Sequence, residues 1–194
     1  MLFDGTKKRF QMLNAGVEIT TNQVQYSLLD RRVENSMSDL AQEHNIPYLC
    51  YGSIAGGFLS DRYLGTSDPT QPYENRSLTK YRLIIDEFGG YNLFQELLKV
   101  LRTIADKYHV GVAEIASKYV LQKPMVASVI IGARNNKHLN NLKKLDYFNL
   151  NNDDLEAISK IIDISKGPYG PFYELERDKT GKHGSIMKYN LNES

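Results

Sequence analysis

Three strand-like segments, separated by helical ones, constrain the fold of this chain more than any other feature. Segments rich in β-branched or apolar residues lie at 17–24, 47–53 and 127–131. Helices are expected before, between and after them, at 4–14, 33–44, 91–108, 112–121, 136–144 and 153–164. Asn152 stands where the N-cap of the last helix is expected. Alternating strands and helices favour a parallel sheet built from strand–helix–strand units. A closed barrel of this class has eight strands and a doubly wound sheet about five or six, so three strands predict only part of such a sheet.

The charge balance excludes several classes of partner. The chain has 24 Lys and Arg against 23 Asp and Glu, a net charge of +1, so we expect no nucleic-acid partner. No apolar run approaches the roughly 20 residues that span a bilayer, so we expect no membrane partner. The single cysteine, Cys50, excludes an internal disulfide and fits a reducing compartment, which predicts a cytoplasmic protein. Cys50 and the four histidines lack metal-ligand spacing, so no metal site is expected.

The first strand ends in Asn-Gln-Val-Gln-Tyr-Ser-Leu-Leu-Asp, residues 22–30. Ligands of α/β proteins bind at the carboxyl ends of parallel strands, so this is a candidate binding segment. The Gln23 amide can both donate to and accept from a carboxamide. The alternative is that these amides satisfy nearby backbone groups.

The second strand ends in Tyr-Gly-Ser-Ile-Ala-Gly-Gly, residues 51–57. Gly52 and Gly56 have no Cβ, so backbone amides there could approach a phosphate closely. Tyr51 offers a flat face on which another ring could stack. The glycine spacing matches neither the Rossmann nor the P-loop fingerprint, and a plain turn is the alternative.

The third strand leads through Ile-Gly-Ala-Arg, residues 131–134, into a helix. Helix N-termini favour anions, and the forked guanidinium of Arg134 suits a phosphate monoester. The alternative is an exposed arginine at a helix start.

In this order and at these separations, the three strand ends resemble the last three barrel strands of the aldo-keto reductases. Residues 111–124, Gly-Val-Ala-Glu-Ile-Ala-Ser-Lys-Tyr-Val-Leu-Gln-Lys-Pro, are similar to that family's helix before its last strand. The resemblance covers roughly residues 1–164. It implies an α/β fold that is a partial (β/α)8 TIM barrel with three C-terminal parallel strands. We expect residues 1–166 to form the barrel portion and residues 167–194 a polar tail, of which residues 174–194 are loosely attached.

The resemblance also implies a cofactor, NADP(H). Gln23 is similar to the residue that holds the nicotinamide carboxamide, and Tyr51 to the aromatic residue that stacks on the nicotinamide ring. The pyrophosphate loop is matched by four residues, Gly52, Ser53, Ile54 and Gly56.

The match to the family's residues that bind the adenosine part of the cofactor is less complete. Arg134 matches a residue that grips the 2′-phosphate, which favours NADP over NAD, and His138 lies beside that phosphate position. The family's adenine-contacting asparagine would fall on Leu142, whereas Asn141 lies one residue earlier. Either the helix has lost a residue or the adenine contact is altered.

The implied activity is reversible hydride transfer between NADPH and the carbonyl carbon of an aldehyde, ketone or sugar. The family's catalytic Asp, Tyr, Lys and His come from its first four strands, which would precede Met1, so we expect no catalytic residue in this chain. Three hypotheses follow. The chain is a truncated part of an active reductase, an inactive degenerate relative, or a non-enzymatic interaction module that contacts a partner or itself through open barrel edges. In such a partial barrel, apolar side chains such as Val24 and Ile130 are expected to face an open barrel centre.

Overall fold

The computed structural model describes residues 11–132, 139–170, 172 and 174–187. Its sheet contains the strands β1 (Asn22–Gln25), β2 (Tyr48–Tyr51) and β3 (Val126–Ile130) in that spatial order, with both pairings parallel. This confirms the expected α/β class and the three parallel strands. The first strand is shorter than expected, because only the end of segment 17–24 pairs with β2.

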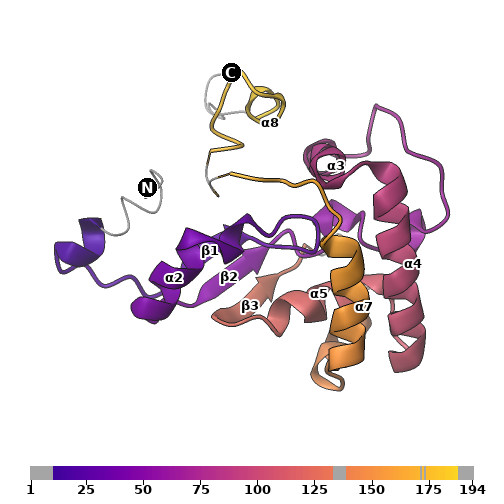
Figure 1. The fold of residues 1–194 in the computed structure, drawn as a ribbon, viewed down its shortest axis with the longest axis horizontal. Coiled ribbons are helices and arrows are strands. Elements are labelled where there is room, and N and C mark those ends of the chain that lie inside the picture. Colours follow the sequence, from indigo (N-terminus) through magenta and orange to yellow (C-terminus); the bar gives the residue numbers. More distant parts are fainter. Residues whose placement is uncertain (1–10, 133–138, 171, 173, 188–194) are drawn as a thin grey trace.

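The helices pack around this sheet (Figure 1). They are α2 (Ser36–Glu43), α3 (Arg76–Phe88), α4 (Tyr91–Tyr108), α5 (Val112–Leu121), α6 (Leu139–Leu142), α7 (Asn152–Ile162) and α8 (Lys182–Ser185). The expected bounds of α4 and α5 are confirmed. The helix α3 was not anticipated. It begins where Asn75 accepts a hydrogen bond from the Leu78 backbone N–H and ends at Gly89.

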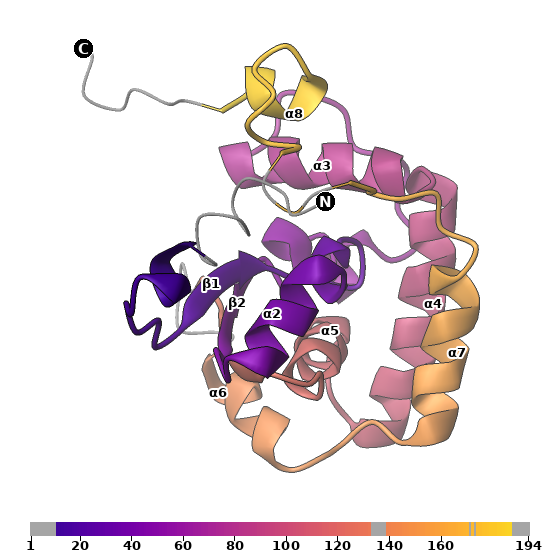
Figure 2. The ribbon, with the colours of Figure 1, turned by 60° about the vertical axis from the view of Figure 1, so that its left-hand side comes forward.

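The start of α7 corrects one expectation. Asn152 was expected to cap this helix, but Asn151 does so and accepts a hydrogen bond from the backbone N–H of Asp154 at 2.9 Å. The Asp154 carboxylate accepts in return from the Asn151 backbone N–H at 3.0 Å. Only Asn151 lies three residues before this acid, which is the spacing that a capping box needs. Asp154 also pairs with Lys107 at 3.0 Å, which ties α7 to the neighbouring α4 (Figures 1 and 2).

The core lies between the sheet and the helices. Val24 and Cys50 are opposite each other in register, and both are fully buried. Val24 had been expected to face an open barrel centre. That expectation is wrong, because alternation along the strand turns Val24 towards the helices. Ile130, by contrast, is 44% exposed, as expected for a residue that faces away from them.

Burial also keeps the thiol of Cys50 neutral. It raises the pKa of the Cys50 thiol to about 12, so the side chain is a small, neutral core residue. Within the described part of the chain, no helix is both long enough and apolar enough to cross a membrane.

A buried ion pair fixes the segment after β1. The guanidinium of Arg32 donates to both carboxylate oxygens of Asp30, at 2.9 and 2.7 Å, and neither residue is more than 2% exposed. Burial alone would lower the pKa of Arg32, but the hydrogen bonds and charges of Asp30 and Glu176 raise it, so the guanidinium stays charged.

The same arginine holds the C-terminal tail. Arg32 donates to the carbonyl oxygen of Phe172 at 3.3 Å and to the Glu176 carboxylate at 3.2 Å. Further along, Arg76 of α3 donates to the carbonyl oxygen of Ile186 at 2.7 Å, and α8 lies beside α3 (Figure 2). The described tail residues are therefore packed against the body of the chain, contrary to the expected loose attachment.

Replacing Arg32 by alanine should destabilise the fold by about 3–5 kcal/mol, because the buried Asp30 carboxylate loses its charged partner. The control is Arg31→Ala, since Arg31 pairs with Glu34 at 3.8 Å and with no other acid in the described part of the chain, and both side chains are about one-third exposed. That variant should lose less than about 1 kcal/mol. Urea denaturation followed by circular dichroism measures both, and equal losses would contradict a structural role for the buried pair.

Candidate functional site

Two of the sequence-predicted residues share one face of the sheet. Gln25 lies opposite Tyr51 in register, and Gln23 is two residues before it, so Gln23 and Tyr51 point to the same side. The Gln23 side chain is exposed and Tyr51 is half-buried. An amide and an aromatic ring therefore lie on one face near the carboxyl ends of two parallel strands, where ligands of such sheets bind.

Helix α3 and the tail lie over this end of the sheet. The Lys80 ammonium is 5.6 Å from the centre of the Tyr51 ring and 5.7 Å from that of Tyr81. Its charge is paired with the Glu176 carboxylate at 3.5 Å. Because Glu176 also pairs with Arg32, a single tail carboxylate joins α3 to the segment after β1.

Gly52 and Gly56 have a structural reason to be glycine. Both have positive φ, and a Cβ at Gly52 would lie 2.2 Å from the Tyr81 hydroxyl oxygen. A Cβ at Gly56 would lie 2.7 Å from the Tyr81 ring. Tyr81 thus occupies the space that a side chain at either position would need. Gly57, by contrast, has no atom within 4 Å of its Cβ position among the described residues.

Two buried polar atoms near Tyr51 have no hydrogen-bond partner among the described residues. They are the Ser53 hydroxyl oxygen and the Gln25 side-chain carbonyl oxygen. The Gln25 amide nitrogen is occupied, since it donates to Asp30 at 2.6 Å. Unsatisfied buried polar atoms are rare in native proteins, and a ligand or water commonly accounts for them. Gln25 was not among the sequence-predicted residues, although alternation along β1 places it on the same face as Gln23.

The third strand end is only partly described. Arg134 and His138 lie outside the described residues. Gly132 is exposed, with no atom within 4 Å of its Cβ position among the described residues, and Asn141 is half-buried in α6. Ile54, in the loop after β2, is also half-buried.

Comparison with known proteins identifies the family. The profile of the Aldo/keto reductase family matches residues 6–163, most of the chain. The chain belongs to this family. An aldo-keto reductase of Babesia bovis is 30% identical over 135 residues, which cover 66% of this chain and 46% of the relative. The flagellar radial spoke protein 5 of Chlamydomonas reinhardtii is 33% identical over 110 residues, covering 55% of this chain and 21% of the relative.

Solved structures confirm the fold. A glycerol dehydrogenase from Gluconobacter oxydans superposes with a TM-score of 0.70 at 19% identity, covering 86% of this chain and 49% of that one. The holo form of an aldo-keto reductase from Bacillus halodurans gives a TM-score of 0.59 at 24% identity, covering 84% of this chain and 48% of that one. The three strands with their helices are therefore part of a TIM barrel. The chain spans about half the length of the reductases it matches, and about a fifth of the spoke protein.

Members of this family generally bind nicotinamide cofactors, and the described residues fit such a group in part. The exposed Gln23 amide and the half-buried Tyr51 ring suit a nicotinamide carboxamide and ring. In the adjoining loop, the Ser53 hydroxyl is buried and has no hydrogen-bond partner among the described residues. At Gly52 and Gly56 the side-chain space is taken by Tyr81, so only their backbone atoms could take part. Among the described residues, no group of three or more His, Cys, Asp or Glu could hold a metal ion.

Replacing Gly52 by alanine should destabilise the fold by about 1–3 kcal/mol, because the new methyl group overlaps the Tyr81 hydroxyl. Combining it with Tyr81→Phe removes that oxygen and should recover part of the loss. Thermal unfolding of the two single variants and the double variant measures the coupling. Gly57→Ala is the control, since it shares the positive φ but meets no neighbouring described atom. If the stability losses of the two single variants simply add in the double variant, the contact with Tyr81 is not the reason that residue 52 is a glycine.

Proposed function

We propose that this chain forms the NADP(H)-binding side of an aldo-keto reductase site that transfers hydride to or from a carbonyl or sugar substrate. The observation that carries the proposal is the placement of Gln23 and Tyr51 on one face at the strand ends. The profile match over residues 6–163 supports the same assignment.

Each residue has a role in this proposal. The Gln23 amide pairs with the nicotinamide carboxamide, and the Tyr51 ring stacks on the nicotinamide. Ser53 and Ile54 line the pyrophosphate together with the backbone of Gly52 and Gly56. Arg134 and His138 bind the 2′-phosphate and Asn141 approaches the adenine. These contacts hold and orient the cofactor, which supplies the hydride when bound.

Residues 1–194 alone should not reduce carbonyls, because the proposal assigns no proton donor within them. Lys80 and Tyr81 lie close to Tyr51, and they are of the same residue types as the family's catalytic lysine and tyrosine. Burial raises the pKa of Tyr81, however, which weakens it as an acid, and its hydroxyl packs on Gly52. Lys80 is in turn paired with Glu176. The proposal therefore names no catalytic residue in this chain.

A second candidate function is a non-enzymatic interaction module. One relative is named for a flagellar radial spoke rather than for a redox reaction. Ile130 is exposed on the open face of the sheet, and within the described residues β1 and β3 each pair with β2 alone. Unpaired strand edges pair readily with another chain, so this module would bind a protein partner or a second copy. A partner that co-purifies with the chain in fixed ratio, together with no dinucleotide binding, would favour it.

The proposed location is the cytoplasm, on the basis of the single buried, unpaired cysteine. Structural thiols without partners fit a reducing compartment.

The purified chain should show no NADPH-dependent reduction of a generic aldehyde, measured as loss of NADPH absorbance. General acid–base help alone contributes roughly 10²–10⁴-fold to such reactions. Turnover at an ordinary enzymatic rate, by material shown to be free of host reductases, would contradict the proposed lack of a catalytic residue.

The chain should bind NADPH at least tenfold more tightly than NADH, since a charge-assisted contact to a phosphate is worth about 1.5–3 kcal/mol. Arg134→Ala should remove that preference and leave NADH binding nearly unchanged, as measured by calorimetry. The matched control is Arg62→Ala, because Arg62 pairs with Glu74 on the surface. An equal loss for both cofactors would show that Arg134 acts structurally rather than on the 2′-phosphate.

A further inference from the structure

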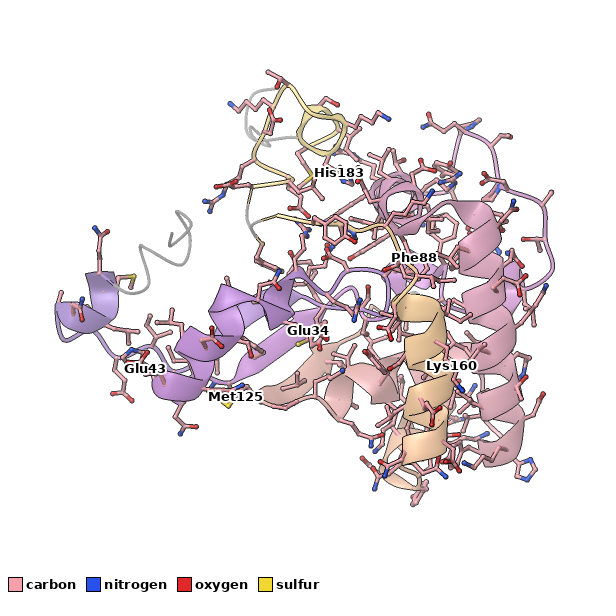
Figure 3. The ribbon with its side chains drawn as sticks, viewed as in Figure 1. Glu34, Glu43, Phe88, Met125, Lys160 and His183 are labelled. Atoms are coloured by element: carbon pink, nitrogen blue, oxygen red, sulfur yellow. The ribbon has the colours of Figure 1, made fainter. Side chains whose placement is uncertain are left out.

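A carboxylate of the tail lies one side chain away from the Tyr51 ring. Glu176 contacts the Lys80 ammonium at 3.5 Å, and that ammonium is 5.6 Å from the centre of the Tyr51 ring. The tail reaches this place because it passes beside α3, from the helix end at Phe88 to α8, which carries His183 (Figure 3). Both charged side chains are largely shielded from solvent.

The tail segment that carries Glu176 is anchored on both sides. Before it, the Phe172 carbonyl oxygen accepts a hydrogen bond from Arg32 at 3.3 Å. After it, the Ile186 carbonyl oxygen accepts one from Arg76 at 2.7 Å. The segment between these anchors can therefore move away from α3 while both of its ends stay attached.

The two cations that Glu176 contacts differ in what they would lose if it moved. Arg32 donates to both carboxylate oxygens of Asp30, so it keeps a charged partner without the tail. Lys80 pairs with no acid other than Glu176 in the described part of the chain. Its ammonium has three donors on a flexible stem, so it can turn to another anion.

Charge balance makes Glu176 and a bound anion mutually exclusive. Asp30, Arg32, Glu176 and Lys80 form a group of two carboxylates and two cations in contact. A further anion beside Tyr51 would leave a negative charge without a partner in a place that is poorly hydrated, which is costly. If Glu176 moves out, two cations face one carboxylate, and the anion takes its place.

The next residue of α3 sets Lys80 beside the glycine-rich loop. Tyr81 packs so closely on Gly52 and Gly56 that a Cβ at either position would overlap it. In the proposed function this loop lines the pyrophosphate of a dinucleotide. The phosphates are the anionic groups of such a ligand, so they are the groups that Lys80 can attract.

We propose that Glu176 and a phosphate of the dinucleotide compete for Lys80, so that the tail covers the site until the cofactor binds and displaces the Glu176 segment. The inference rests on the proposed function, since it needs a dinucleotide at Tyr51. It adds a phosphate-binding residue in α3 and a regulatory contact in the tail.

Amide hydrogen exchange, followed by NMR, tests the displacement in the unmodified chain. The backbone N–H groups of Arg177 and Asp178 donate to the Glu174 carbonyl oxygen, each at 3.0 Å, which slows their exchange. Saturating NADPH should speed this exchange by about fivefold or more, and Glu176→Gln should do so without NADPH, as expected when an ion pair of this kind is lost. Unchanged or slower exchange with NADPH bound would overturn the proposal.

The affinity for NADPH, measured by calorimetry, tests the competition. Glu176→Gln should bind NADPH about fivefold more tightly, the factor that corresponds to an ion-pair energy of about 1 kcal/mol. The matched control is Glu174→Gln, which removes the same charge from the same segment but breaks no ion pair within the described residues. It should bind NADPH like the parent chain, and an equal gain in both variants would overturn the proposal.

Lys80→Met tests whether the competition acts through the ammonium. In that background Glu176→Gln should change the affinity for NADPH by less than about twofold, because the cation for which both anions compete is gone. A gain as large as in the parent chain would overturn the role of Lys80.

Tyr51→Ala separates this inference from the proposed function. If NADPH binding weakens in Tyr51→Ala but neither NADPH nor Glu176→Gln alters the tail, only the competition is overturned. If the chain does not bind NADPH, or binds it equally well without the Tyr51 ring, the proposed function and this inference are both overturned.

Discussion

The buried pair of Asp30 and Arg32 organises the carboxyl end of this sheet. Asp30 accepts hydrogen bonds from Gln25 and Arg32, so it links the end of β1 to the segment that follows it. Arg32 in turn reaches the tail through Phe172 and Glu176. Removing either member of such a buried ion pair is costly, because the other member is left as a buried charge without an opposite charge beside it. The Asp30–Arg32 pair therefore links β1 to the tail, and the Glu176 carboxylate extends this link to Lys80 of α3.

The two faces of the sheet have different surroundings, and this explains how half of a barrel can carry a core. Val24 and Cys50 are buried under helices, whereas Gln23 and Ile130 are exposed on the opposite face. The helical side supplies the apolar burial that stabilises the fold. The opposite face keeps the polar and aromatic groups that a dinucleotide would meet. Over the end of β2, Tyr81 of α3 packs on the glycine-rich loop, so the space for a side chain at Gly52 and Gly56 is occupied by the chain itself.

The sequence predicted those elements whose signal is local and periodic. The helices α4 and α5 were placed correctly, because their apolar residues recur at helical spacing between clear stop residues. Helix α3 was missed, since its start depends on a cap by Asn75 within a stretch rich in Gly, Pro and Ser. The orientation of Val24 was wrong, because the sheet face of a strand residue depends on where pairing begins. The packing of the tail depends on Arg32, about 140 residues away, and no local pattern reveals such a contact.

In the candidate site, too, some residues could be predicted from the sequence and others could not. Gln23 and Tyr51 were named from the sequence, and the structure places them on one face of the sheet. Gln25, Lys80 and Tyr81 emerged only from the fold. Arg134 and His138 remain predictions. The most direct test of the account is a crystal structure of the chain grown with NADP⁺. We expect the nicotinamide to stack on the Tyr51 ring with its carboxamide hydrogen-bonded to Gln23. A dinucleotide bound away from both residues would contradict the assignment of this site.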